Sequence, residues 1–183
     1  MANAPTTFQC ITLDPKVGRL REIVGPFGIS AAFDPSTTPA AQQPSIVTFN
    51  GIWDTGATNS AITQKVVDAC GLKPFTVGMV NTANGPVQRP VFLINISIFQ
   101  GTTIHNVAAT LGDFVGADAL IGMDVITHGD FSITNEGGHT TFSFRIPSQK
   151  RIDYVRELNQ KKMIGKPHGS AVNPATRRKR GRR

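Results

Sequence analysis

The sequence predicts an all-β domain with one or two short helices, and three observations support this fold class. Short runs rich in Val, Ile, Thr and Phe recur between Gly, Pro and Asn residues, and the chain holds 11 Phe but one Tyr and one Trp. The pair Asn84-Gly85 stands between two such runs, and Asn-Gly is a strong signal for a β-hairpin turn. Hydrophobic residues make up 39% of the 183 residues, which is enough to form a core.

The expected strands follow one another within a single domain at residues 27–147. Each is a short apolar or alternating run that is bounded by turn residues. Residues 1–26 are weakly patterned, so we interpret them as an N-terminal extension. The strands are expected at residues 27–33, 45–53, 76–82, 87–99 and 103–111, followed by a hairpin over residues 131–146 that turns at residues 136–138.

Two short helices are expected inside the domain. Residues 64–70 follow Thr63, a favoured N-cap residue, and precede Gly71, which suits the position just after a helix. The apolar segment 119–126 is expected to pass from a buried strand into the second helix.

A third helix is expected beyond the domain, at residues 148–164. Ser148 is expected to cap this helix, whose apolar residues form only a narrow stripe among charged ones. The stripe consists of Ile152, Val155 and Leu158.

The net charge of +7 is unevenly distributed along the chain. Residues 1–147 hold 7 basic and 10 acidic residues, whereas residues 148–183 hold 12 basic and 2 acidic residues. The folded part is therefore slightly acidic, and the positive charge belongs to the C-terminal segment. We expect residues 165–183, which end in the basic run Arg177–Arg183, to be a disordered tail.

Cysteine usage and hydropathy indicate a soluble protein of a reducing cytoplasm. Cys10 and Cys70 are the only cysteines, so no disulfide framework is expected, and two thiols without clustered histidines do not make a zinc site. The N-terminus lacks the regions of a signal peptide, and no apolar run approaches the roughly 20 residues that a membrane helix needs. The sequon Asn95-Ile96-Ser97 is then a chance occurrence.

The most informative segment is Asp54-Thr55-Gly56-Ala57, which directly follows the strand expected at residues 45–53. A strand that ends at an aspartate places the carboxylate at the floor of a cleft. Gly56 permits a tight turn, and its amide can approach the carboxylate because no Cβ intervenes. Thr55 is expected to lock the turn by a hydrogen bond to the backbone. The segment fits a carboxylate-based hydrolase, although a strand-terminal Asp in an ordinary turn has the same pattern.

A second motif, Leu120-Ile121-Gly122-Met123-Asp124, places Gly122 68 residues after Asp54, with a β-rich interval and the Asn-Gly hairpin between. The two motifs resemble those of the retropepsin-like aspartic proteases. That family has an apolar-apolar-Asp-Thr-Gly-Ala motif, a flap hairpin, and then an apolar-apolar-Gly motif followed by Asp, Asn or a near equivalent. The resemblance extends from about Phe27 to Ile146, and the Leu-Ile-Gly-Met-Asp form is similar to cellular and bacterial members more than to retroviral ones.

The resemblance implies a single-lobe acid-protease barrel that acts as a homodimer. The chain holds one Asp-Thr-Gly, whereas pepsin-like enzymes need two, so a second chain must supply the second Asp54. By the same resemblance, Thr55 of each chain forms a crossed hydrogen-bonded pair beneath the two aspartates. The implied flap, which closes over the substrate, consists of Asn81, Thr82, Ala83, Asn84 and Gly85.

The chemistry of paired carboxylates supports the same mechanism. Two carboxylates in close contact cannot both ionise readily, so the pair shares one proton. The ionised Asp54 accepts a proton from the attacking water, and the protonated Asp54 donates toward the carbonyl oxygen of the peptide bond. This hydrolysis of a peptide or protein substrate requires neither a cofactor nor a metal.

Other residues are weaker candidates for catalytic or metal-binding roles. Asp124 is the main competitor for a second acid, but it follows the glycine motif instead of an Asp-Thr-Gly turn, which favours a structural role. Asp113 and Asp130 are expected at the surface, and Ser60 lacks a nucleophile elbow and a catalytic partner. The histidines, none with metal-ligand spacing, are His105, His128, His139 and His168.

Two other functions are compatible with the sequence. The first is a non-catalytic dimer of the same fold that binds nucleic acid weakly through Arg177–Arg183, since such contacts to phosphates are sequence-blind and salt-dependent. The tail is equally consistent with a merely solvated terminus or with a segment that the protease itself removes. The second is a processing unit released from a larger polyprotein, although Met1 favours an independent start.

Overall fold

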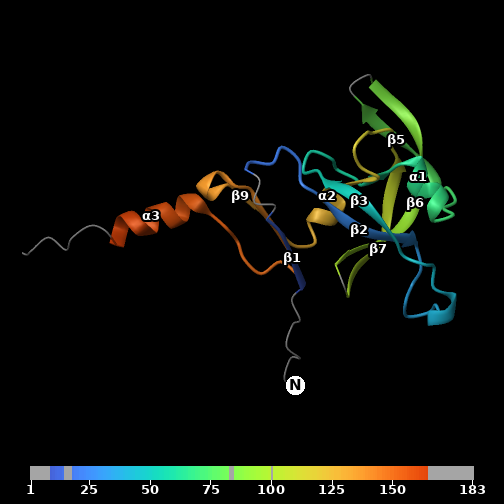
Figure 1. Cartoon of the computed structure of the whole chain (residues 1–183), viewed down its shortest axis with the longest axis horizontal. Coiled ribbons are helices and arrows are strands. Elements are labelled where there is room, and N and C mark those ends of the chain that lie inside the picture. Colours follow the sequence, from blue (N-terminus) through green and yellow to red (C-terminus); the bar gives the residue numbers. More distant parts are fainter. Residues whose placement is uncertain (1–8, 15–17, 83–84, 100, 165–183) are drawn as a thin grey trace, which may run out of the picture. The chain divides into compact units, whose positions relative to one another are not determined.

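The computed structural model describes residues 9–14, 18–82, 85–99 and 101–164 (Figure 1). The chain divides into two compact units, Met1–Gln149 and Lys150–Arg183. The strands of the first unit are β1 (Gln9–Leu13), β2 (Val24–Ala31), β3 (Val47–Trp53), β4 (Ala61–Ile62), β5 (Thr76–Thr82), β6 (Gly85–Phe99), β7 (Thr102–Leu111), β8 (Ala119–Ile121), β9 (Asp130–Thr134) and β10 (Thr141–Ile146). The helices are α1 (Gln64–Ala69), α2 (Met123–Ile126) and, in the second unit, α3 (Tyr154–Ile164), with 3-10 turns at Ala40–Gln42 and Glu136–Gly138.

Six strands close into a barrel in the order β2-β3-β8-β4-β7-β6, because β6 pairs back onto β2. The pairs β3–β8 and β4–β7 are parallel, and the others are antiparallel. The seventh strand of this sheet, β5, pairs with β6 alone and forms a hairpin that projects from the barrel (Figure 1). The prediction of an all-β barrel with short helices is therefore confirmed.

Strand β6 belongs to both the hairpin and the barrel. Its first half pairs with β5, from Thr82↔Gly85 to Thr76↔Val91, and its second half pairs with β2, from Ile94 to Ser97. Strand β7 pairs with β6 from Val91 to Phe99, with two shifts of register on the way. The hairpin is thus a continuation of the barrel wall.

A separate three-stranded sheet has the order β1-β10-β9. The expected C-terminal hairpin is present as β9 and β10, but β1 was not expected, since residues 9–13 lie in the segment that we interpreted as a weakly patterned extension. This strand pairs with β10 across more than 120 residues of sequence, from Gln9↔Ile146 to Leu13↔Phe142. The domain boundaries at residues 26, 147 and 164 stay a prediction, and the expected tail at residues 165–183 lies outside the described residues.

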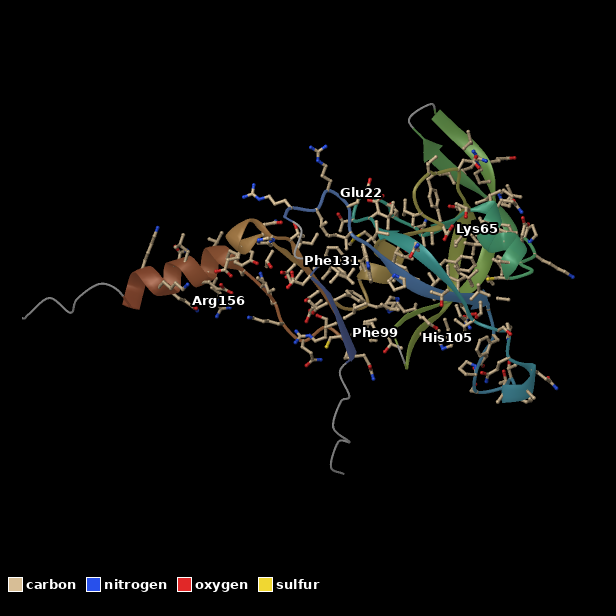
Figure 2. All side chains as sticks on the ribbon, in the orientation of Figure 1. Glu22, Lys65, Phe99, His105, Phe131 and Arg156 are labelled. Carbon is tan, nitrogen blue, oxygen red and sulfur yellow. The ribbon has the colours of Figure 1, made fainter. Side chains whose placement is uncertain are left out.

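Trp53, the last residue of β3, is the centre of an aromatic cluster between the barrel and the three-stranded sheet. Its side chain is 6% exposed, and its ring lies 4.8 Å from that of Phe144 and 5.1 Å from that of Phe142, measured between centroids. The rings of Phe27 and Phe131 pack against it at 5.2 and 5.9 Å; Phe131 is labelled in Figure 2. Aromatic pairs of this kind contribute beyond the area that they bury.

Replacing Trp53 by Leu is expected to lower the free energy of unfolding by about 2 kcal/mol, because the smaller side chain leaves part of this buried site empty. Urea denaturation of the two proteins measures the difference. Replacing Phe75, which is 67% exposed, by Leu should leave the free energy of unfolding within about 0.5 kcal/mol of the parent. Equal losses at the two positions would contradict the cluster.

One of the two expected helix caps is present and the other is wrong. Thr63 is the N-cap residue of α1, as expected, although its hydroxyl donates to the carbonyl of Asp118 (3.1 Å) instead of accepting a helix amide. Ser148 caps no helix, because its hydroxyl donates to Asp130 (2.6 Å) and α3 begins only at Tyr154. The first turn of α3 is capped by Asp153, whose carboxylate accepts the amide of Arg156 (3.0 Å).

Asn95, the first residue of the sequon, has a buried side chain. It is 2% exposed, donates a hydrogen bond to the carbonyl of Phe33 and accepts one from the amide of Asn106. The interpretation of Asn95-Ile96-Ser97 as a chance sequon agrees with this burial.

Among the residues described here, no helix has the length and apolar character needed to span a membrane.

Candidate active site

Asp54 is the first residue after β3, beside the end of the parallel strand β8. Its own amide donates to the carbonyl of Ile121, the last residue of β8, at 2.9 Å. The amide of the preceding residue donates to the carbonyl of Ile23, also at 2.9 Å. The backbone at Asp54 is therefore held from two neighbouring segments, while its side chain is partly exposed.

The turn after Asp54 has the geometry that the sequence predicts for Gly56. The Gly56 amide donates to Oδ1 of Asp54 at 2.8 Å, and a Cβ on Gly56 would lie only 3.2 Å from that oxygen. The amide of Ala57 donates to the carbonyl of Asp54 (3.3 Å) and completes the turn. Thr55 differs from expectation, because its exposed hydroxyl makes no hydrogen bond within the described part of the chain.

Gly122 packs directly against this turn. A Cβ at residue 122 would lie 2.7 Å from the carbonyl carbon of Asn59 and 3.0 Å from the carbonyl oxygen of Ala57. The amides of the next two residues along the chain donate to the carbonyls of Ala57 (2.8 Å) and Thr58 (3.1 Å). The Leu120–Asp124 segment and the Asp54 turn are thus brought together, 68 residues apart in sequence, by contacts that only glycine at position 122 permits.

Asp124 reaches the same turn with its side chain. Its Oδ2 accepts the amide of Ser60 (2.9 Å), and its Oδ1 accepts the hydroxyl of Ser60 (2.8 Å). That hydroxyl in turn accepts the amide of Gly122 (3.1 Å), so Ser60 is hydrogen-bonded to both Gly122 and Asp124. Sequence reasoning weighed Ser60 only as a nucleophile, although a small polar residue directly before an apolar strand is a signal for a buried linking role.

The expected flap corresponds to the β5–β6 hairpin. Asn81 pairs with Pro86, and Thr82 pairs with Gly85, whose φ of 104° lies in a region that favours glycine. Ala83 and Asn84, the residues expected at the turn, lie outside the described residues. On the exposed side of β5, Val77 is 61% exposed and Met79 is 62% exposed.

The other acidic residues that sequence reasoning weighed make contacts away from this turn. Asp113 forms an exposed ion pair with Arg89 of β6 (2.8 Å). Asp130 accepts hydrogen bonds from the side chain of Arg145, from Ser148 and from the amide of Gln149, and so ties β9 to the end of β10.

The described histidines and cysteines form no metal site. His105 and His128 line, with Asn59 and Asp124, a cavity of about 190 Å³; His105 is labelled in Figure 2. No group of three or more His, Cys, Asp or Glu side chains in the described part of the chain is arranged to hold a metal ion. Burial raises the pKa of the Cys70 thiol, which disfavours its reactive thiolate form.

Comparisons with known proteins bear on this arrangement. Residues 47–128 match a protein family described as gag-polyprotein putative aspartyl protease. A search of curated protein sequences gives no match.

Solved structures with a similar fold include a retropepsin-like aspartic protease from Rickettsia conorii, which is 15% identical, with 80% of this chain and 99% of that chain covered and a TM-score of 0.48. The Simian Foamy Virus (mac) protease is 14% identical, with 56% of this chain and 91% of that chain covered and a TM-score of 0.35. A Legionella pneumophila protein with unknown function is 19% identical, with 43% and 74% covered and a TM-score of 0.29.

The matched residues 47–128 contain the Asp54 turn, the β5–β6 hairpin and the Leu120–Asp124 segment, which are the parts on which the sequence resemblance rests. The resemblance of the sequence to aspartic proteases of this kind is therefore confirmed over the matched segment.

Proposed function

We propose that this chain is an aspartic endopeptidase that acts as a homodimer, with the Asp54 carboxylates of two chains in one active site. The observation that carries the proposal is the Asp54 turn. An acidic side chain stands partly exposed at the end of a buried strand, and the Gly56 amide holds one of its oxygens at 2.8 Å. This turn lies in the segment that matches an aspartic protease family.

The geometry of the turn suits the shared-proton mechanism. The Gly56 amide stabilises negative charge on Oδ1 of Asp54 and orients the carboxyl group. One Asp54 takes a proton from a water molecule, which attacks the carbonyl carbon of the peptide bond. The other Asp54 gives its proton to the carbonyl oxygen, which forms a tetrahedral diol. The first Asp54 then gives the proton that it took to the amide nitrogen, and the C–N bond breaks while a diol hydroxyl returns its proton to the other Asp54, so the pair again shares one proton.

The homodimer follows from the number of such turns. One chain offers a single Asp-Thr-Gly, and the two-carboxylate chemistry needs two, which a two-fold axis beside Asp54 provides. The exposed hydroxyl of Thr55 is available for the crossed pair with a second chain. The residues Asn81, Thr82, Ala83, Asn84 and Gly85 of the hairpin then close over the substrate, and Leu120, Ile121, Gly122 and Asp124 support the turn from behind.

The proposal is tested by measuring cleavage of a peptide library between about pH 3 and pH 7, where a carboxylate dyad works, with the Asp54→Asn protein as control. The substrate is an extended peptide or protein, so cleavage within the chain of the peptides is the expected product pattern. Absence of cleavage by the parent at every pH, or equal cleavage by parent and control, would overturn the proposal.

The shared active site has a separate consequence for mixtures of the two proteins. A tenfold excess of Asp54→Asn chains, after exchange of subunits, is expected to reduce the activity of the parent to about a tenth, because most parent chains then face an inactive partner. The activity is measured with substrate in excess over total protein, and the same excess of an unrelated protein serves as control. Unchanged parent activity after demonstrated exchange would show that each chain acts alone.

A further inference from the structure

Ser60 and Asp124 join the two segments on which the proposed active site depends. Three backbone hydrogen bonds connect the turn at residues 54–60 with residues 121–124, and three further ones use a side chain. All three of the latter depend on the hydroxyl of Ser60 or the carboxylate of Asp124. Half of the connection therefore rests on two side chains.

Burial makes this connection sensitive to substitution. Ser60 is 1% exposed, and the Gly122 amide, which donates to its hydroxyl, is in a buried residue. Removing the hydroxyl leaves that amide without a partner, and a buried unpaired amide is costly. The carboxylate of Asp124 accepts two hydrogen bonds from the same residue, and hydrogen bonds to an ionised acceptor are the stronger kind.

The connection also bears on where the Asp54 carboxylate stands. The backbone from Ala57 to Ser60 is the part of the turn that Gly122 and Asp124 contact, and the same turn supplies the Gly56 amide to Oδ1 of Asp54. A turn that loses half of its attachment shifts or fluctuates, and a misplacement of about 1 Å in a reacting group can cost about 100-fold in rate.

We propose that Ser60 and Asp124 are a positioning pair for the reaction, in which the Asp124 carboxylate acts through Ser60 to hold the Asp54 turn in its productive geometry. The inference rests on the proposed endopeptidase function and extends it to two residues that touch neither the substrate nor the reacting atoms. It gives Ser60 a role in catalysis without making it a nucleophile.

The test compares Ser60→Ala, Asp124→Asn and the double variant in the full chain. Ser60→Ala is expected to lower kcat by about 10- to 100-fold while KM changes by less than about twofold, since the substrate contacts are untouched. Asp124→Asn is expected to lose less, because its remaining oxygen still accepts one hydrogen bond from Ser60. The double variant should be no worse than about threefold below Ser60→Ala, as expected for residues that act as one unit.

Asp118 provides a matched control. It stands directly before β8, accepts the amide of Asn50 of β3 (3.2 Å) and pairs with Lys65 of α1 (2.9 Å), which is labelled in Figure 2. It therefore also joins β3 to the segment that carries Gly122, but at the end away from Asp54. Asp118→Asn is expected to lower Tm and to leave kcat within about twofold of the parent, because it does not touch the turn.

Amide hydrogen exchange gives a readout that does not depend on activity. Ser60→Ala should speed exchange at Met123 and Asp124, whose amides bond to the turn, and Asp118→Asn should not. An active parent with parent-like kcat in Ser60→Ala would overturn the positioning role and leave the endopeptidase intact. Equal losses of kcat in Ser60→Ala and Asp118→Asn would show that Ser60 and Asp124 only stabilise the fold, and would overturn the positioning role. A parent that is inactive overturns both proposals.

Discussion

Replacing Asp54 by Asn is expected to lower kcat for peptide cleavage by at least about a thousandfold, while the free energy of unfolding changes by less than about 1 kcal/mol. The amide has the same shape as the carboxylate, and its oxygen can still accept the Gly56 amide. Its nitrogen cannot take a proton from water, so the shared-proton chemistry is lost in every dimer. Steady-state kinetics and urea denaturation measure the two quantities.

The matched control for this change is Asp68→Asn. Asp68 lies exposed on α1, where its carboxylate accepts a hydrogen bond from the side chain of Gln64 (2.8 Å). The substitution Asp68→Asn removes the same charge as Asp54→Asn, and the Asp68→Asn protein should keep the activity of the parent. Sedimentation of both variants checks that dimers persist. A variant at position 54 that still cuts at the parent rate would remove Asp54 from the mechanism, and an inactive Asp68→Asn would assign the loss to charge.

Replacing Gly122 by Ala is expected to lower the free energy of unfolding by about 3 kcal/mol and to abolish peptide cleavage. The new methyl group would lie 2.7 and 2.9 Å from the carbonyl carbon and oxygen of Asn59, and 3.0 Å from the carbonyl oxygen of Ala57. These are backbone atoms of the turn that follows Asp54, so the clash is relieved only by moving that turn. Thermal and urea denaturation measure the loss of stability, and the peptidase assay measures the loss of function.

Gly25 of β2 offers the control for an added methyl group. Its nearest neighbour would be Cδ1 of Leu13 at 3.2 Å, which is the movable end of a side chain. Gly25→Ala should therefore cost less than about 1 kcal/mol and keep cleavage activity. If Gly122→Ala were as stable and active as Gly25→Ala, the packing of Gly122 against the turn would not describe the protein in solution.

The sequence predicts the parts of the site that depend on near neighbours. The hydrogen bond from Gly56 to Asp54 spans two residues, and a glycine in that position is visible in the printed sequence. The strand before Asp54 shows its alternation directly. The role of Gly122 was found only through resemblance to a family, because its contacts with Ala57 and Asn59 join distant parts of the chain.

The features that the sequence did not predict are contacts with partners that lie far away along the chain. The hydroxyl of Thr63 suits a helix cap, but the carbonyl of Asp118 from another segment takes its hydrogen bond. The hydroxyl of Ser60 is identifiable as polar and small, yet its partner Asp124 is set by the register of β4 against β8. Strand β1 is short, and its pairing with β10 spans most of the chain. Local sequence patterns contain no information on which distant segment supplies a hydrogen-bond or strand partner.

The continuity of β6 determines how the hairpin opens. A two-stranded hairpin has marginal stability by itself, and here β5 ends its pairing at Val91, the residue where β7 begins. Local opening of the hairpin is therefore expected to stop near Val91, beyond which the strand pairs with β7 and, from Ile94 on, with β2 as well. The amides of Gly85, Val87, Gln88, Arg89 and Val91 should exchange with solvent at progressively slower rates toward Val91, while Pro86 and Pro90 have no amide hydrogen. The protein thereby keeps a locally unstable element in its proposed flap without loosening its core.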